Sequence, residues 1–121
     1  MKNLLLLFSL LSFTILSSCY YDVEEELYPN TCNTSGTTFS GTVNPLLVSY
    51  GCLGCHSGTG AQGNVNLEGY NNVKAKVADG KLWGAINHQP GFSAMPQGSA
   101  KMSSCDISKI KAWIDSGIPN N

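Results

Sequence analysis

Apolar residues near the C-terminal end of the chain recur at the three- and four-residue spacing of an amphipathic helix. They are Ile107, Ile110, Trp113 and Ile114. Ser103 or Ser104 can cap this helix, and Asp106 lies in its first turn, where a negative charge suits the helix dipole. Gly117 and the proline two residues later end it. We expect the stripe to be core and to cross the helix that precedes residue 52.

A second helix is predicted over residues 39–50, provided that Pro45 lies in its first turn, where a missing N–H is tolerated. Its apolar face consists of Val43, Leu46, Leu47 and Tyr50. Gly51 ends this helix, and residues 70–78 and 81–86 are shorter candidates. Residues 57–66 and 87–100 are rich in glycine, proline and small polar residues and are predicted loops. The pattern indicates an all-α domain of three to five helices.

The first 18 residues have the pattern of a secretory signal peptide. Lys2 supplies the positive end, and residues 4–16 form an apolar run too short to span a membrane as a mature helix. The run ends at Ser17, Ser18 and Cys19, which resembles a bacterial lipobox with Cys19 as the acylated first residue of the mature protein. The alternative is ordinary cleavage nearby, with Cys19 left as a thiol.

Residues 19–31 lack apolar periodicity and carry four acidic side chains, so we expect a solvated tether. The acidic cluster resembles the surface-export signals of some lipoproteins, although a solubilising spacer explains it equally well. A diacylated terminus gives stable anchoring. We therefore expect an exported protein, lipid-anchored in the bacterial cell envelope, at the outer membrane rather than the inner one, facing the periplasm or the surface.

The remaining residues, 32–121, are enough for one small domain, which buries only a modest core on its own. Residues 27–121 contain six lysines and four carboxylates, and the whole chain contains no arginine. This mild positive balance lacks the basic footprint of a nucleic-acid-binding protein.

The most informative stretch is Cys52-Leu53-Gly54-Cys55-His56, which has the C-x-x-C-H pattern of c-type haem attachment. Two residues between the sulfurs match the distance between the two vinyl groups on one edge of a porphyrin. A histidine directly after the second cysteine then lies beneath the iron. The motif predicts one covalent haem c bound by Cys52, Cys55 and His56.

Two other kinds of site also use C-x-x-C. A zinc ribbon needs a second ligand pair of similar spacing, but Cys32 and Cys105 stand alone in the sequence. A redox dithiol is expected at the start of a helix in a strand-rich fold, which this sequence does not suggest. The histidine after the second cysteine favours haem.

A resemblance to a known family rests on three features: the C-x-x-C-H motif behind a short helix, the Met95-Pro96 pair in a late loop, and the terminal helix at residues 107–121. Together they resemble a single-haem, class I type cytochrome c. The stretch 32–121 is similar to the lipoprotein cytochrome c domains of Gram-negative bacteria. The resemblance implies a small domain packed around one covalent haem.

The sixth iron ligand has three candidates, Met95, Met102 and His88. Met95 is preferred because it matches the family's Met-Pro position and lies in a loop stiffened by prolines. We expect Met102 to pack at the entry to the last helix. His88 is either a loop histidine near the haem rim or a second imidazole ligand.

The chain departs from the family in one respect. Class I cytochromes often use a proline carbonyl soon after the motif to accept the second ring N–H of the histidine, but here no proline lies between His56 and Pro90. We therefore expect a backbone carbonyl of the 57–68 loop to orient His56.

The cysteine count leaves Cys32 and Cys105 once lipid and haem have taken the other three. Because disulfides persist in exported proteins, we predict a Cys32–Cys105 bond that ties the start of the domain to its last helix.

Several neighbouring side chains are weaker candidates. Trp83, Phe92 and Tyr70 are candidates for the wall of a haem pocket, and Trp83 or Asn87 for a propionate contact. A docking rim for an acidic partner would consist of Lys74, Lys76, Lys81 and Lys101, although a plain solvated face explains these lysines as well.

The resemblance implies electron transfer by a membrane-tethered monohaem cytochrome c whose iron cycles between ferric and ferrous states. It implies redox-protein partners and no catalysis, because ligands on both sides of the iron leave no open position. One alternative is a haem-based enzyme or ligand sensor with an open or displaceable sixth site, although no arginine and no obvious acid–base pair accompany His88. Another is a haem-bearing accessory subunit of a larger redox complex.

Overall fold

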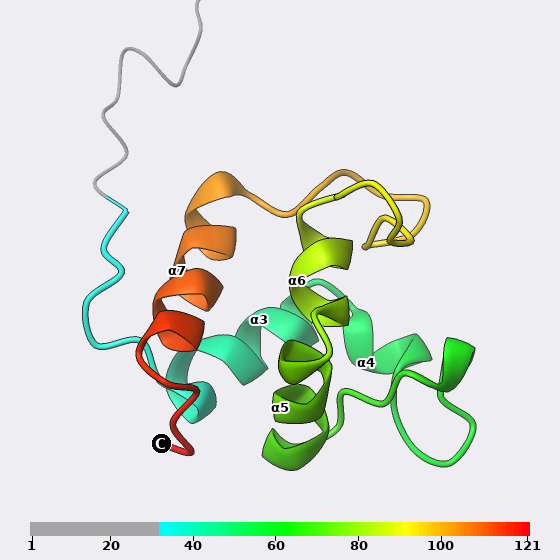
Figure 1. Ribbon diagram of the computed structural model, residues 1–121, viewed down its shortest axis with the longest axis horizontal. Helices are drawn as coiled ribbons and strands as arrows, with labels where there is room; N and C mark the ends of the chain where they lie inside the picture. The colour runs from blue at the N-terminus through cyan, green and yellow to red at the C-terminus, as the bar shows by residue number, and fades with distance from the viewer. Residues whose placement is uncertain (1–31) are drawn as a thin grey trace, which may run out of the picture. The chain divides into compact units, whose positions relative to one another are not determined.

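The computed structural model of the chain describes residues 32–121 (Figure 1). The predicted signal peptide 1–18, the tether 19–31 and the lipidation at Cys19 lie outside these residues. The described part contains α-helices, one π-helical turn and one 3-10 turn, and no strand, which confirms the all-α prediction. No helix in residues 32–121 has the length and apolar character needed to cross a membrane.

The predicted helices appear in their expected order, and the structure adds two short helical segments, one within the motif and one within the predicted 57–66 loop. Their bounds are η1 Phe39–Val43, α3 Asn44–Ser49, α4 Cys52–Cys55, η2 Gln62–Asn64, α5 Tyr70–Ala78, α6 Lys81–Ile86 and α7 Ser104–Asp115. In Figure 1, α5 and α6 follow one another in the middle of the view, with α7 on one side and α4 on the other. Helices α5, α6 and α7 occupy the predicted ranges.

The predicted 39–50 helix forms in two parts because of Pro45. The turn η1 is π-helical: the Val43 N–H donates to the Thr38 carbonyl at 3.1 Å, five residues back. Pro45 then lies in the first turn of α3, as expected, where its missing N–H costs no helical hydrogen bond. Gly51 follows with a left-handed φ of 71° and turns the chain into α4.

The core joins α7 to the segments on either side of the C-x-x-C-H motif. Its fully or nearly buried side chains are Phe39, Val43, Leu47, Leu67, Val73, Leu82, Ile86, Met102, Ile107, Ile110 and Trp113. The α7 stripe is core as predicted, and α7 packs mainly against η1, the first part of the predicted 39–50 helix. Phe39 packs edge-on against Tyr70 and at a tilt against Trp113.

Hydrogen bonds hold the end of the chain against this core. The Trp113 indole N–H donates to the Pro119 carbonyl at 2.9 Å, and the Tyr70 hydroxyl donates to the Ile118 carbonyl at 2.8 Å. The side-chain oxygen of Asn121 accepts from the Phe39 N–H at 2.9 Å. The last residues therefore cover the side of the core where η1 begins.

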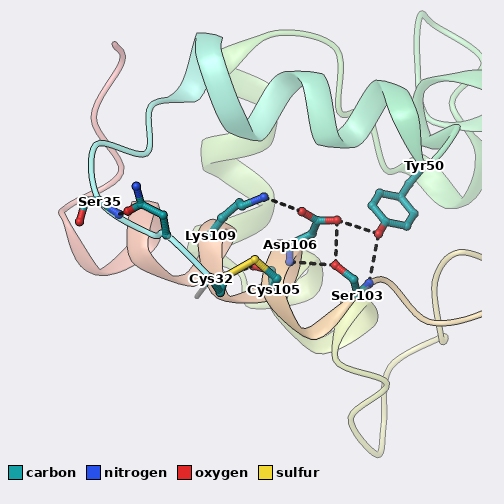
Figure 2. Close-up of a disulfide and its surroundings, with 8 residues drawn as sticks. Cys32, Ser35, Tyr50, Ser103, Cys105, Asp106 and Lys109 are labelled. Atoms are coloured by element: carbon teal, nitrogen blue, oxygen red, sulfur yellow. Dashed lines mark hydrogen bonds and ion pairs between the residues drawn. A yellow bond between two sulfur atoms is a disulfide. The ribbon is translucent and has the colours of Figure 1, made fainter. Parts of the chain in front are cut away.

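The start of the described chain meets the start of α7 (Figure 2). The sulfurs of Cys32 and Cys105 lie at bonding distance, 2.09 Å, and their Cα atoms are 5.4 Å apart, within the range that disulfides adopt. This geometry fits the predicted disulfide.

A polar cluster next to this pair connects α7 to the chain just before the motif (Figure 2). Asp106 accepts from the Tyr50 hydroxyl at 2.9 Å and from the Ser103 hydroxyl at 2.8 Å, and it pairs with Lys109 at 3.0 Å. The Ser103 hydroxyl also accepts from the Asp106 N–H, so Ser103, one of the two predicted candidates, caps α7. Partial burial raises the pKa of the Asp106 carboxyl, but the three hydrogen bonds and the neighbouring ammonium charge outweigh it and hold that pKa below its usual value.

Candidate functional site

The C-x-x-C-H motif begins as a single helical turn. Helix α4 contains both cysteines, and the His56 N–H donates to the Cys52 carbonyl at 2.9 Å. Neither thiol is bonded to another cysteine. Cys55 is exposed, whereas Cys52 is half-buried, and burial raises the pKa of its thiol.

The imidazole of His56 is oriented by the loop that follows it. Its Nδ1 lies 3.0 Å from the Val65 carbonyl oxygen, which can only accept a hydrogen bond, so Nδ1 carries the proton and donates. The Leu67 N–H donates to the His56 carbonyl at 2.7 Å and fixes the backbone of the same residue. The expected carbonyl of the 57–68 loop is therefore that of Val65. This arrangement leaves Nε2 available to a metal.

A cavity of about 650 Å³ lies next to the motif, and we call it the motif cavity. Cys52, Cys55, His56 and Met95 all line it. Its apolar walls are Val65, Leu67, Leu82, Ala85, Ile86 and Phe92. Met95 belongs to the loop between α6 and α7, drawn yellow to orange in Figure 1, far from the motif in sequence. The fold thus brings the four predicted cofactor-binding side chains to one cavity.

The other two candidates for the sixth ligand lie elsewhere. Met102 is only 3 % exposed and belongs to the core just before α7, as expected. His88 is exposed and does not line the motif cavity. Its Nε2 instead lies 2.9 Å from the Met95 carbonyl oxygen.

Only one of the three aromatic residues considered for the wall of a haem pocket lies at the motif cavity. Phe92 lines the motif cavity, but Trp83 and Tyr70 do not. Trp83 and Asn87 line a second groove of about 590 Å³, along α6 and α7, where the Lys111 ammonium lies 5.8 Å from the centre of the Trp83 ring. The predicted propionate contact from Trp83 or Asn87 is therefore not supported by their position.

The lysines proposed for a docking rim have different neighbours in the structure. Lys81 is the one formally charged side chain among the described residues that line the motif cavity, apart from the titratable His56. Lys76 and Lys81 both approach Asp79, and Lys74 lies over the Tyr70 ring. No sequence pattern separates Lys81 from the other lysines, because its place at the cavity depends on how α6 packs.

Within residues 32–121, no three His, Cys, Asp or Glu side chains converge as a metal-ion cluster. Comparison of the chain with protein-family models, with curated proteins and with solved structures found no match. The functional interpretation therefore rests on the residues of this chain and on their arrangement.

Proposed function

We propose that this protein is a monohaem c-type electron carrier. The observation that carries the proposal is the motif cavity, where two free thiols and an imidazole from one segment face the same space as a thioether from a distant loop. A haem c needs this set of groups: two sulfurs for the vinyl groups and two axial ligands for the iron.

The size and lining of the cavity fit such a group. A volume of about 650 Å³ lies within the range of roughly 300–1,000 Å³ that small-molecule and cofactor pockets span. The walls are mainly apolar, which suits the flat, apolar face of a porphyrin. Lys81 supplies a positive charge at the lining, where a haem propionate would be a suitable partner.

The two axial ligands would have different tasks. His56 would bind the iron through Nε2, with its ring held by the Val65 carbonyl. Met95 would bind as the sixth ligand, and a thioether favours ferrous iron and so raises the reduction potential relative to a second imidazole. Because both axial positions are then taken by the protein, a substrate has no open position.

When bound, the haem supplies one-electron exchange between ferric and ferrous iron. The chain would attach the group through Cys52 and Cys55, orient it through His56, and cover it with the apolar walls of the motif cavity. The domain would thus insulate the redox centre and present it to a partner.

The proposal includes a place in the cell. Residues 1–18 would direct export, and acylation of Cys19 would anchor the chain in the cell envelope, at the outer membrane rather than the inner one. In the oxidising environment outside the inner membrane, a Cys32–Cys105 disulfide would persist. Its partners would be other redox proteins, and the charge pattern gives no reason to expect nucleic acid.

The test is a set of visible spectra on the exported, purified protein, with a pyridine haemochrome assay for covalent haem. We expect a low-spin spectrum with a weak sulfur-to-iron charge-transfer band. Met95→Ala should lose this band and gain carbon monoxide binding in the reduced state. Met102→Leu, a volume-conserving change in the core, is the matched control and should keep the wild-type spectrum.

Three outcomes would contradict the proposal. Absence of covalent haem would refute it entirely. Loss of the charge-transfer band in Met102→Leu alone would make Met102 the ligand. Rapid carbon monoxide binding by the reduced wild-type protein would favour a haem enzyme or ligand sensor with a displaceable sixth site.

A further inference from the structure

We infer that His88 is a positioning residue for the sixth ligand: its imidazole fastens the backbone of Met95 from outside the motif cavity. This inference rests on the proposed function, in which Met95 binds the iron. It assigns a role to a histidine that the sequence offered as a ligand or as a plain loop residue.

The segment concerned is the ligand loop, residues 87–99, which begins at the end of α6. Three backbone hydrogen bonds fold it back onto that helix. The Ala85 carbonyl accepts from the His88 N–H at 3.2 Å and from the Met95 N–H at 3.1 Å, and the Gly84 carbonyl accepts from the Gln89 N–H at 2.9 Å. The amide of Met95 is therefore held directly by α6.

The carbonyl of Met95 is held by the His88 side chain. Nε2 of His88 lies 2.9 Å from this oxygen, and because a carbonyl only accepts, Nε2 is the donor. His88 and Ala85 thus bind the two ends of one residue, while the Met95 side chain lines the cavity. An exposed imidazole placed in this way acts on the ligand without contacting the cavity itself.

The backbone of His88 adopts a left-handed conformation, which allows its side chain to reach Met95. Its φ is 56°, in the left-handed region, which few residues other than glycine adopt, although asparagine, aspartate and histidine do so more often than the rest. This conformation reverses the chain after α6, and the side chain can then reach back to Met95. Strain at such a position persists only where surrounding interactions hold it.

Phe92 adds an apolar contact to the same arrangement. Its ring lies against Gly84 of α6 so closely that a Cβ atom at Gly84 would overlap it. The ring also lines the motif cavity. Helix α6 therefore holds the ligand loop at its hydrogen-bonded start, at the Phe92 ring and at Met95.

The consequence concerns how easily Met95 leaves the iron. A ligand presented by a pre-ordered loop binds without a large ordering cost, and an external ligand must first open that loop. Removing the His88 hydrogen bond should favour the open state and so increase the apparent affinity of ferric iron for an external ligand.

The test is a spectrophotometric titration of the purified ferric protein with imidazole at fixed pH, which follows the shift of the main visible haem absorption band in every variant. His88→Asn keeps a residue that tolerates the left-handed backbone but is too short to reach Met95. Loss of one neutral hydrogen bond corresponds to roughly a fivefold change in an equilibrium constant, so we expect about fivefold tighter imidazole binding. His88→Gly, which also suits this backbone, should behave in the same way and guards against a folding defect in one variant.

The matched control is Gln89→Ala, because the Gln89 side chain is exposed and makes no hydrogen bond within the described residues. It should bind imidazole as the wild type does. Met95→Ala should bind more tightly than any His88 variant, because no internal ligand competes.

Two results would overturn the inference, and they differ in what they say of the proposed function. If Met95→Ala binds imidazole more tightly but both His88 variants match the wild type, His88 does not position Met95 and His/Met ligation stands. If Met95→Ala, too, binds imidazole as the wild type does, Met95 is not the ligand, and both this inference and the proposed His56/Met95 ligation fail.

Discussion

The two ring nitrogens of His56 illustrate how single residues prepare this site. The Val65 carbonyl fixes Nδ1 as a donor, and Nε2 is left for the iron of the proposed haem. The C-x-x-C-H pattern identified His56 directly. No sequence pattern pointed to Val65, since any carbonyl of the 57–68 loop could have served.

A first prediction concerns the contribution of the Asp106 side chain to stability. The Asp106→Asn variant keeps the size of the side chain but loses the charge that the hydrogen bonds of Tyr50 and Ser103 and the Lys109 ion pair stabilise. We expect a loss of about 1–2 kcal/mol in the free energy of unfolding at neutral pH. Denaturant unfolding of the two proteins at several pH values measures it.

The pH dependence of this loss has a definite sign. The pKa of Asp106 is lowered in the folded state, so its charge stabilises the fold above the ordinary carboxyl pKa. That contribution disappears as the pH falls through the lower, folded-state pKa, and the two proteins should then converge. Asp115→Asn is the control: its partner is the exposed Lys111, and we expect a change of less than about 0.5 kcal/mol. A difference for Asp106→Asn that stays constant through acid pH would contradict this account.

Helix α6 is only six residues long, yet it contacts the core, the motif cavity and the ligand loop. One of its faces contributes Leu82 and Ile86 to the core and to the wall of the motif cavity. Its carbonyls at Gly84 and Ala85 hold the ligand loop. The helix therefore connects the core to the residue that would complete the iron site.

Gly84→Ala tests this connection. Helix propensity alone predicts that alanine stabilises a helix interior by about 1 kcal/mol. Here the new Cβ atom would overlap the Phe92 ring, so we expect a net loss of about 1–3 kcal/mol and a weaker sulfur-to-iron band. Thermal unfolding followed with the visible spectrum measures both effects.

The control for this change is Gly84→Ala combined with Phe92→Ala, which removes the ring atoms that the new Cβ atom would meet. The double variant should recover part of the lost stability. A single Gly84→Ala variant that melts at a higher temperature than the wild type would show that α6 does not need this close contact.

The elements themselves were largely predictable from local signals. The α7 range followed from the spacing of its apolar residues, the Ser103 cap and the Gly117 stop, and these signals act within one helix. The π-helical turn before Pro45 was not predicted, because apolar spacing does not distinguish a wider turn from an α-helical one. The Gly84–Phe92 contact and the His88–Met95 bond were missed, since both depend on how a loop returns to its helix.

For the molecule as a whole, a small domain with a modest core needs further connections between its ends. The Cys32–Cys105 pair joins the first described residue to α7 over a sequence separation of 73. The Asp106 cluster lies beside it and connects α7 to Tyr50, just before the motif. Together they hold the start of the described chain and the residue that follows α3 against α7 (Figure 2).

The double variant Cys32→Ser/Cys105→Ser measures the contribution of this pair without leaving an unpaired thiol. Closing a loop of this length could stabilise the fold by up to about 4 kcal/mol in the chain-entropy model. We expect a lower midpoint in guanidinium chloride with an unchanged visible spectrum. Mass spectrometry that finds both thiols reduced in the native exported protein, or an unchanged midpoint, would contradict the prediction.

The arrangement of the whole site could be predicted only partly from the sequence. Cys52, Cys55 and His56 lie together in one short motif, so their proximity follows from their spacing. Met95 could be placed opposite them only through a resemblance, because loop closure over residues 87–99 is set by tertiary packing. The position of Lys81 at the cavity and of Trp83 away from it likewise depends on the orientation of α6.

Electron transfer by a His56/Met95-ligated haem is tested by a potentiometric redox titration of the purified protein, followed in the visible spectrum. We expect one reversible one-electron transition. We also expect a lower midpoint potential for Met95→Ala, since the thioether that favours ferrous iron is lost. A protein with no reversible transition, or a midpoint that Met95→Ala leaves unchanged, would contradict electron transfer by a His56/Met95-ligated haem.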